Sequence, residues 1–163
     1  LILLGSTLPF LQGRKMQLDN LPFEYQGDLL EPGKVSEEYI QFIATRYMHA
    51  PYLWGGKTLF GIDCSGLVQM VYKILGYRIY RDAYQQAEQG QPIALEQATT
   101  GDLAFFKNEA DRITHVGLIL DDKRIIHAHG HVRIDIVDEK GIFNLTTKKY
   151  SHKFSHCRRI LDY

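Results

Sequence analysis

The hydrophobic pattern of the chain changes its period near Gly101-Asp102, and this change most constrains the fold. Before that point, apolar residues recur at helical spacing in residues 36–48 and 63–75. After it, five segments have the pattern of strands, mostly joined by short polar turns: 103–106, 113–120, 124–128, 132–137 and 154–160. Helices followed by an antiparallel meander predict an α+β fold.

The ends of the two main helices carry recognisable signals. Ser36 is a good N-cap with acidic residues following it, and Pro51 marks the end of that stretch. Asp63 can cap the second helix, and Gly76 suits the position after its last turn. A short helix is expected over residues 82–88.

The first 33 residues differ from the rest. Residues 1–4, 15–18 and 24–25 have the composition of short strands separated by turn residues, and 31–33 has that of a linker. About 30 residues are too few for an independent barrel. We therefore expect residues 1–33 to be the trailing half of a small β-barrel or strands packed onto a main domain of residues 34–163.

Composition excludes several classes of protein. Lys plus Arg equal Asp plus Glu at 19 each, so a nucleic-acid binder with a broad basic face is not expected. No apolar stretch reaches the roughly 18–20 residues of a membrane span, and the apolar start lacks the features of a signal peptide. The chain does not begin with Met, so we expect a processed product or a fragment, whose compartment stays open.

Cys64 is the first candidate for chemistry. It follows the capping Asp63 at the start of a predicted helix, where partial positive charge and unpaired N–H groups favour a thiolate. The small neighbours Ser65 and Gly66 let another segment approach the sulfur. The alternative is a small buried hydrophobic residue, as most free cysteines are, and the local pattern leaves both open.

His115 and His127 are candidates for a base and an orienting group, although a satisfied core histidine is the more common case for a residue such as His115. Strand parity tests the functional interpretation. A two-residue turn at residues 122–123 would place the two histidines on opposite faces of the sheet. A triad with Cys64 therefore predicts an odd-length connection or a bulge near 121–124.

A metal site is the competing interpretation of the histidines. His127, His129 and His131 share a strand face, and further ligands are available from His152, His156 and Cys157. Three alternate histidines on one strand diverge and do not converge tetrahedrally, so we expect no metal and no other cofactor.

Three short stretches accompany Cys64 and His127: Tyr52-Leu53-Trp54-Gly55-Gly56, Gly101-Asp102-Leu103 and His115-Val116-Gly117. With these features the chain resembles the NlpC family of bacterial cell-wall cysteine peptidases. The resemblance covers about residues 36–161. It implies a papain-like fold with the nucleophile helix packed against an antiparallel sheet. It also implies that Cys64 is the nucleophile, His115 the base and then the acid, and His127 the orienting residue.

The resemblance also implies a substrate. Family members hydrolyse the amide between D-γ-glutamate and a diamino acid, meso-diaminopimelate or lysine, in peptidoglycan stem peptides. The most similar subgroup carries an SH3-like region, to which residues 1–33 would correspond. In that subgroup Tyr52 and Trp54 would line the substrate site, while Asp63 and Ser65 would bind the free amine of L-alanine in released muropeptides.

Several alternatives stay open. Asp63 can serve as a helix N-cap only, and Ala83 stands where many relatives have serine. The chain can be a non-catalytic muropeptide-binding module, or an endopeptidase acting on intact cell wall. We expect a monomer, in the cytoplasm or the cell envelope.

Overall fold

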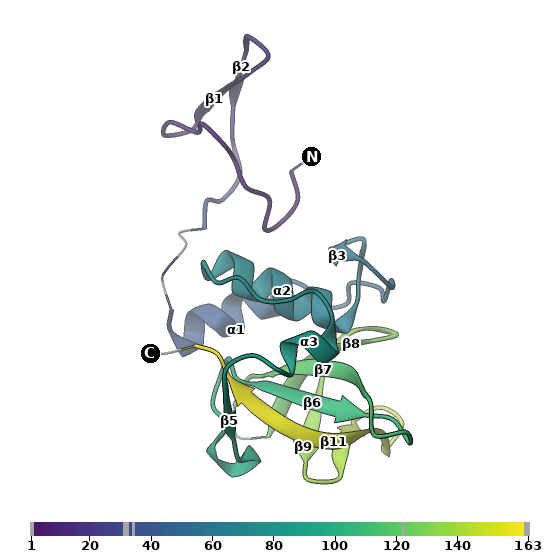
Figure 1. The fold of residues 1–163 in the computed structure, drawn as a ribbon. Coiled ribbons are helices and arrows are strands. Elements are labelled where there is room, and N and C mark those ends of the chain that lie inside the picture. The colour runs from purple at the N-terminus through teal and green to yellow at the C-terminus, as the bar shows by residue number, and fades with distance from the viewer. Residues whose placement is uncertain (1, 31–32, 34, 122, 162–163) are drawn as a thin grey trace.

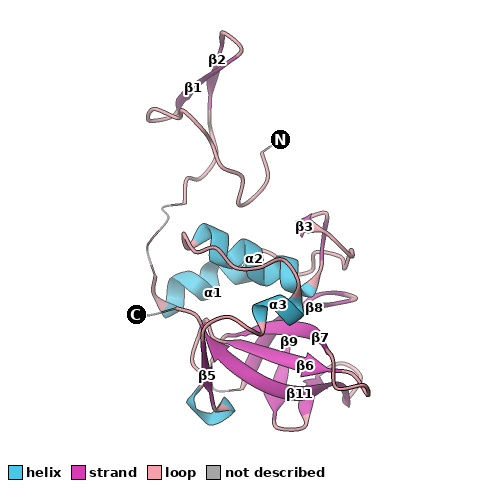
Figure 2. Cartoon of the chain, viewed as in Figure 1, coloured by secondary structure: helices cyan, strands magenta, loops and turns pink. Residues whose placement is uncertain are grey.

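The computed structural model describes residues 2–30, 33, 35–121 and 123–161, in which helices cover one side of an antiparallel sheet (Figures 1 and 2). The helical elements are α1 (Glu37–Thr45), α2 (Cys64–Ile74), α3 (Ala83–Gln86) and the 3₁₀ turn η1 (Leu95–Gln97). The predicted α+β arrangement is thus confirmed. Among the described residues, no helix has both the length and the apolar character needed to cross a bilayer.

The sheet closes on itself. Its strands are β5 (Gln91–Ile93), β6 (Leu103–Lys107), β7 (Ile113–Ile119), β8 (Arg124–His129), β9 (His131–Asp138), β10 (Gly141–Asn144) and β11 (Lys149–Arg159). They lie in the order β10-β9-β8-β7-β6-β11-β5, and an extra pairing of β10 with β11 joins six of them into a barrel. The sequence predicted the meander but not β5 and β10, which are too short to show a clear period.

Alternation along the strands separates two cores. Val116, Leu118 and Ile126 face the helices, where α2 packs against β7 and β8. Ile119 and Ile125 belong to a second cluster inside the barrel. A side chain on β7 or β8 therefore points to the helix layer or to the barrel interior according to its parity.

The predicted N-caps and the glycine after α2 are confirmed, whereas α1 ends at Thr45, well before Pro51. The Ser36 side chain accepts a hydrogen bond from the Tyr39 N–H at 3.2 Å, and Asp63 Oδ1 accepts one from Gly66 at 2.6 Å. Gly76 follows α2 with φ +92°, a conformation that glycine adopts without steric cost.

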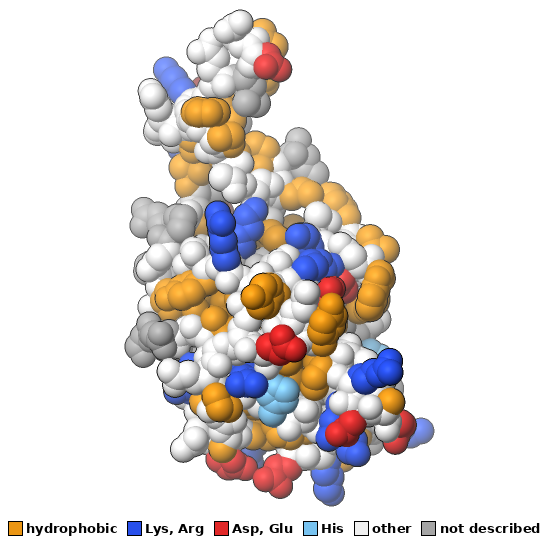
Figure 3. Space-filling model, viewed as in Figure 1, with side chains coloured by type: hydrophobic (Ala, Val, Ile, Leu, Met, Phe, Trp, Pro, Cys, Tyr) orange, Lys and Arg blue, Asp and Glu red, His pale blue; other side chains and the backbone are white. Residues whose placement is uncertain are grey.

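The N-terminal segment projects from the body of the molecule (Figures 1 and 3). It holds one hairpin, β1 (Lys15–Leu18) and β2 (Leu21–Glu24), turned at Asp19-Asn20 with positive φ at both residues. The predicted strands at 1–4 and 24–25 are wrong: residues 2–4 form none, and the second strand lies at 21–24. Residues 1, 31 and 32 lie outside the described part, and the SH3-like assignment stays a prediction.

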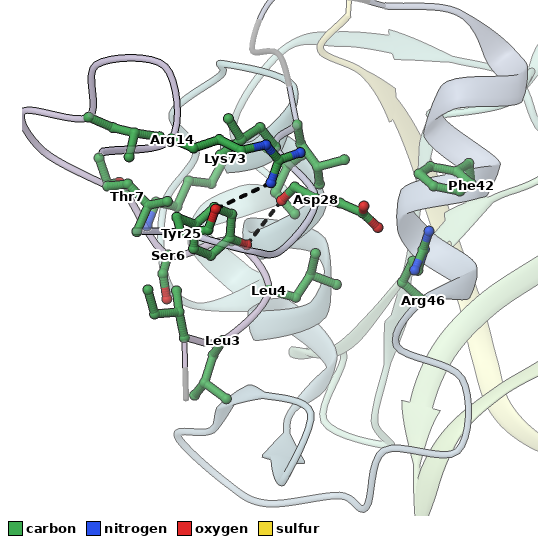
Figure 4. A pocket seen from close by; sticks show the side chains of 17 residues that line it. Leu3, Leu4, Ser6, Thr7, Arg14, Tyr25, Asp28, Phe42, Arg46 and Lys73 are labelled. Carbon is green, nitrogen blue, oxygen red and sulfur yellow. Dashed lines mark hydrogen bonds between the residues drawn. The ribbon is translucent and has the colours of Figure 1, made fainter. Parts of the chain in front are cut away.

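A cavity of about 900 Å³ separates this segment from α1 and α2 (Figure 4). The Tyr25 hydroxyl donates to the Asp28 carbonyl at 3.0 Å along its wall. Leu4 packs against the main core, and the Tyr47 hydroxyl donates to its carbonyl at 3.4 Å. Neither Cys64 nor the histidines line this cavity, so it lies apart from the candidate site.

Candidate active site

Cys64 is the first residue of α2 and is 5% exposed. The backbone N–H groups of Val116 on β7, of Ser65 and of Cys64 lie near its sulfur and act to lower its pKa. The start of α2 therefore meets β7 directly beside His115.

Burial opposes ionisation of the Cys64 thiol. Burial raises the pKa of Cys64 to about 11, and the adjacent Asp63 carboxylate adds to the rise, although the backbone N–H groups oppose it. Burial thus opposes the thiolate that the helix start favours, and the thiolate stays a prediction. The cost of desolvating the charged sulfur is larger than the stabilisation that the helix N-terminus gives to it.

His115 and His127 lie on the same face. Leu118 pairs with Ile126, and the Leu120 N–H donates to the Arg124 carbonyl at 2.9 Å. Three residues separate that last pair, so the predicted odd-length connection is confirmed, although residue 122 lies outside the described chain.

Both histidines point into one end of the barrel. His115 Nε2 and His127 Nδ1 are 2.9 Å apart. Gly117 faces His127 across the strands, and a Cβ there would lie 3.1 Å from the His127 Cβ and 2.7 Å from Ile125 Cγ1. Glycine at this position leaves room for the Ile125 side chain and for the Cβ of His127.

Asp135 extends the series of hydrogen bonds from His115 to His127, and the sequence did not predict it. It lies on β9, is fully buried, and its Oδ2 is 3.1 Å from His127 Nε2. The available signal was a lone acid in the alternating strand 132–137, two residues beyond Arg133, which pairs with His127. Recognising Asp135 as a partner of His127 required the register between β8 and β9, which meet at Gly130.

Three further donors hold the Asp135 carboxylate. Arg133 donates from Nε to Oδ2 at 2.6 Å and from Nη2 to Oδ1 at 3.0 Å, and the Leu145 N–H donates to Oδ1 at 2.8 Å. Burial acts to raise the pKa of Asp135, but the hydrogen bonds from His127, Arg133 and Leu145 outweigh it and hold the pKa below its usual range. Burial lowers the pKa of both His115 and His127. The network therefore pairs an ionised carboxylate with neutral imidazoles.

His152, on β11, adds a third imidazole ring to this end of the barrel. It stacks on His115 with ring centroids 4.0 Å apart and an interplanar angle of 20°. The hydrogen bond to His127 fixes the position of one nitrogen of His115, but the His115 ring can still rotate about that bond. The stacked His152 ring restricts this rotation. Burial lowers the pKa of His152 to about 3, so it stacks as a neutral ring.

The predicted alternative metal set is assembled only in part: His127 and His152 come together, and the centroid of the His129 ring lies 4.7 Å from that of His152. His131 stacks on His49, His156 on Phe105, and Cys157 lies in the barrel core. The histidine nitrogens that do cluster, within 4.8 Å of one another, belong to His115, His127 and His152. Nearly parallel stacked rings such as His115 and His152 do not aim their lone pairs at one point, so this trio is a poor cation site without rearrangement.

Asp63 is held by a separate network. Its carboxylate accepts from the Gly55 N–H at 2.7 Å and the Gly66 N–H at 2.6 Å, and Arg81 donates to both oxygens at 2.5 and 3.0 Å. Arg81 also donates to Ser65 Oγ at 2.9 Å. This carboxylate is already neutralised and well supplied with donors, which counts against the predicted amine-binding role and favours the N-cap interpretation.

The other predicted substrate residues lie nearby on the surface. Tyr52 is 36% exposed, and its pKa is raised by burial and then by the nearby charges of Cys64 and Asp63. Trp54 is 81% exposed in the loop before β3 (Lys57–Thr58) and β4 (Gly61–Ile62). Ala83 begins α3 and is buried, so it offers no polar group.

A helix that begins with a buried cysteine and packs on a barrel carrying linked histidines is the arrangement of papain-like peptidase folds. Residues 49–154 match the NlpC/P60 family, and the chain belongs to this family.

Named relatives agree with that family. The chain is 42% identical over 84 residues to a gamma-D-glutamyl-L-lysine dipeptidyl-peptidase of Bacillus subtilis, covering 50% of this chain and 28% of the relative. It is 29% identical over 145 residues to the Bacillus cereus protein of the same name, covering 88% and 39%. A crystal structure of an NlpC/P60 family protein from Bacillus cereus superposes with TM-score 0.71 and 25% identity, covering 91% and 50%. The chain thus spans less than two fifths of these curated relatives.

Proposed function

We propose that this protein is a cysteine endopeptidase that hydrolyses γ-D-glutamyl–diamino acid amide bonds in peptidoglycan stem peptides. The observation that carries the proposal is the position of Cys64, whose sulfur lies against the Val116 N–H beside a His115 already linked to His127. Family membership and the names of the relatives support the substrate class.

The proposed reaction begins from a neutral pair. As the Cys64 sulfur attacks the γ-carbonyl carbon, its proton passes to His115, and the N–H groups at the start of α2 stabilise the oxyanion. The C–N bond breaks when His115 returns the proton to the leaving amine, which gives a thioester. Water then attacks the thioester, losing a proton to His115, and the sulfur leaves and regains that proton.

Cleavage of defined peptides tests this function. We expect wild type to split L-Ala-γ-D-Glu-L-Lys, or its meso-diaminopimelate analogue, after D-glutamate, with products identified by mass spectrometry. Cys64→Ser should be inactive and Cys157→Ser active, since Cys157 is buried in the barrel core. An uncleaved peptide, or equal cleavage by Cys64→Ser, would refute the proposal.

The recycling role is a finer proposal about the same substrate. A requirement for the free amine of L-alanine would restrict the enzyme to released muropeptides. Comparing the peptide with its N-acetylated form measures that requirement. Because Arg81 already pairs with Asp63, we expect less than tenfold preference for the free amine from Asp63 and Ser65 alone; a hundredfold preference would restore the recycling assignment.

A further inference from the structure

We propose that Asp135 is a positioning residue that sets the tautomers of both His127 and His115, so that Nδ1 of His115 is the nitrogen available to take the Cys64 proton. This inference rests on the proposed function, and it adds a fourth member to the Cys64–His115–His127 set. It follows from the direction of each hydrogen bond in the buried series that joins Asp135, His127 and His115.

The first step concerns the carboxylate. Around Asp135, the two Arg133 nitrogens and the Leu145 N–H can only donate. Oδ1 faces only donors, and the Arg133 guanidinium forms an ion pair with Oδ2, so the ionised form is the one that these contacts stabilise. His127 Nε2, 3.1 Å from Oδ2, must then carry a hydrogen and donate it.

The second step concerns the two imidazoles. A neutral His127 that is protonated at Nε2 has a lone pair at Nδ1. His115 Nε2 lies 2.9 Å from that lone pair, so it must be the donor in the pair. A neutral His115 that is protonated at Nε2 is left with a basic Nδ1, and beside an ionised Asp135 no other arrangement of two neutral imidazoles satisfies both contacts.

The third step is the effect of removing the charge while keeping the shape. In Asp135→Asn the amide nitrogen must replace one oxygen. On the Oδ1 side it would face the Leu145 N–H and Arg133 Nη2, which cannot change roles. On the Oδ2 side it would face one such donor, Arg133 Nε, and also His127, which can switch tautomer and accept. The amide is expected to turn to His127, which forces Nδ1–H on His127 and then on His115, blocking the base.

Nitrogen-15 NMR of the imidazoles tests the inference without depending on activity. In wild type at neutral pH, His127 and His115 should both show the Nε2–H tautomer, and in Asp135→Asn both should show Nδ1–H. A wild-type His115 found as Nδ1–H overturns the inference, whether or not the variant folds. If wild type fails to cleave the peptide, the proposed function fails while these spectra still judge the inference.

Kinetics supply the second readout. Asp135→Asn should lower kcat about 10²–10⁴-fold with little change in KM, since the fault lies in proton transfer. Arg133→Gln is the matched control: it removes two hydrogen bonds from the Asp135 carboxylate but keeps the negative charge of that carboxylate. It should retain both Nε2–H tautomers and lose less kcat than Asp135→Asn. Equal losses in the two variants, with unchanged tautomers, would mean that Asp135 has only a structural role.

Discussion

Asp63, at the start of α2, and Asp135, at the end of the barrel, are both buried aspartates held by an arginine. Asp63 accepts from Arg81 and from the backbone N–H groups of Gly55 and Gly66. Asp135 accepts from Arg133 and Leu145 but also from His127. The difference between the two carboxylates is the contact with His127. The Asp63 carboxylate holds a loop against a helix, whereas the Asp135 carboxylate orients two hydrogen-bonded imidazoles.

The comparison teaches that burial and an arginine partner do not by themselves mark a catalytic acid. Each aspartate is stabilised because its charge is matched by donors in a site with little water. Only Asp135 is connected to a group that can change its protonation site. We therefore expect the loss of Asp63 to lower stability and the loss of Asp135 to lower turnover.

The largest stability effect is expected for Asp63→Ala. The substitution removes the α2 N-cap and leaves Arg81 unpaired in a partly buried position. We expect a loss of about 3 kcal/mol in the free energy of unfolding, measured by urea denaturation. Asp82→Ala, at the N-cap of α3, is the control and should cost about 1 kcal/mol. A loss below that of the control would contradict a structural role for Asp63.

Alkylation of Cys64 tests the resting state of the other network. With the thiol pKa raised to about 11, labelling by iodoacetamide should be slow at pH 6 and rise roughly tenfold per pH unit between 7 and 9. Peptide mapping separates Cys64 from Cys157, whose pKa burial raises to about 12. Fast labelling of Cys64 that is independent of pH between 5 and 8 would instead indicate a thiolate–imidazolium pair.

Gly117→Ala probes the space that the barrel network needs. The added methyl group would press on Ile125 and on His127. We expect a cost of about 1–3 kcal/mol in stability, together with a fall in kcat because His127 is displaced. Circular dichroism melts and peptide cleavage measure the two effects. An unchanged kcat would show that the position of His127 tolerates movement.

The smallest effect is the acid sensitivity of the histidine cluster. The pKa of His152 is lowered by burial to about 3 in the folded state, so the unfolded chain takes up protons first. The stability from this group is complete above about pH 6.5 and is lost as the pH falls from there toward 3. We expect His152→Gln to reduce the loss between pH 6.5 and 5 by about 1 kcal/mol, after discounting for partial exposure.

Urea midpoints at the two pH values measure that difference. His131→Gln is a suitable control because His131 is exposed and lies outside the cluster. An identical pH dependence in wild type and His152→Gln would show that His152 is protonated without penalty in the folded protein.

The sequence by itself determined the local structure and the residues of the proposed triad. Ser36, Asp63 and Gly76 mark helix ends through contacts within a few residues. Strand parity, taken together with the proposed triad, predicted an odd-length connection or a bulge near residues 121–124. Local patterns suffice where the physical cause is local. They do not show the closing of the sheet by β10 and β11, because that pairing joins short segments whose period is weak.

Only the tertiary structure decided what surrounds the candidate site. Asp135 meets His127 through the register of β8 and β9, His152 reaches His115 from β11, and Arg81 meets Asp63 across 18 residues of chain. The direction of the pKa shift of Cys64 was decided in the same way: the helix start predicts a lowered pKa, and burial against β7 raises it. Desolvation depends on every segment packed around a group, so a residue's charge cannot be read from its neighbours in sequence.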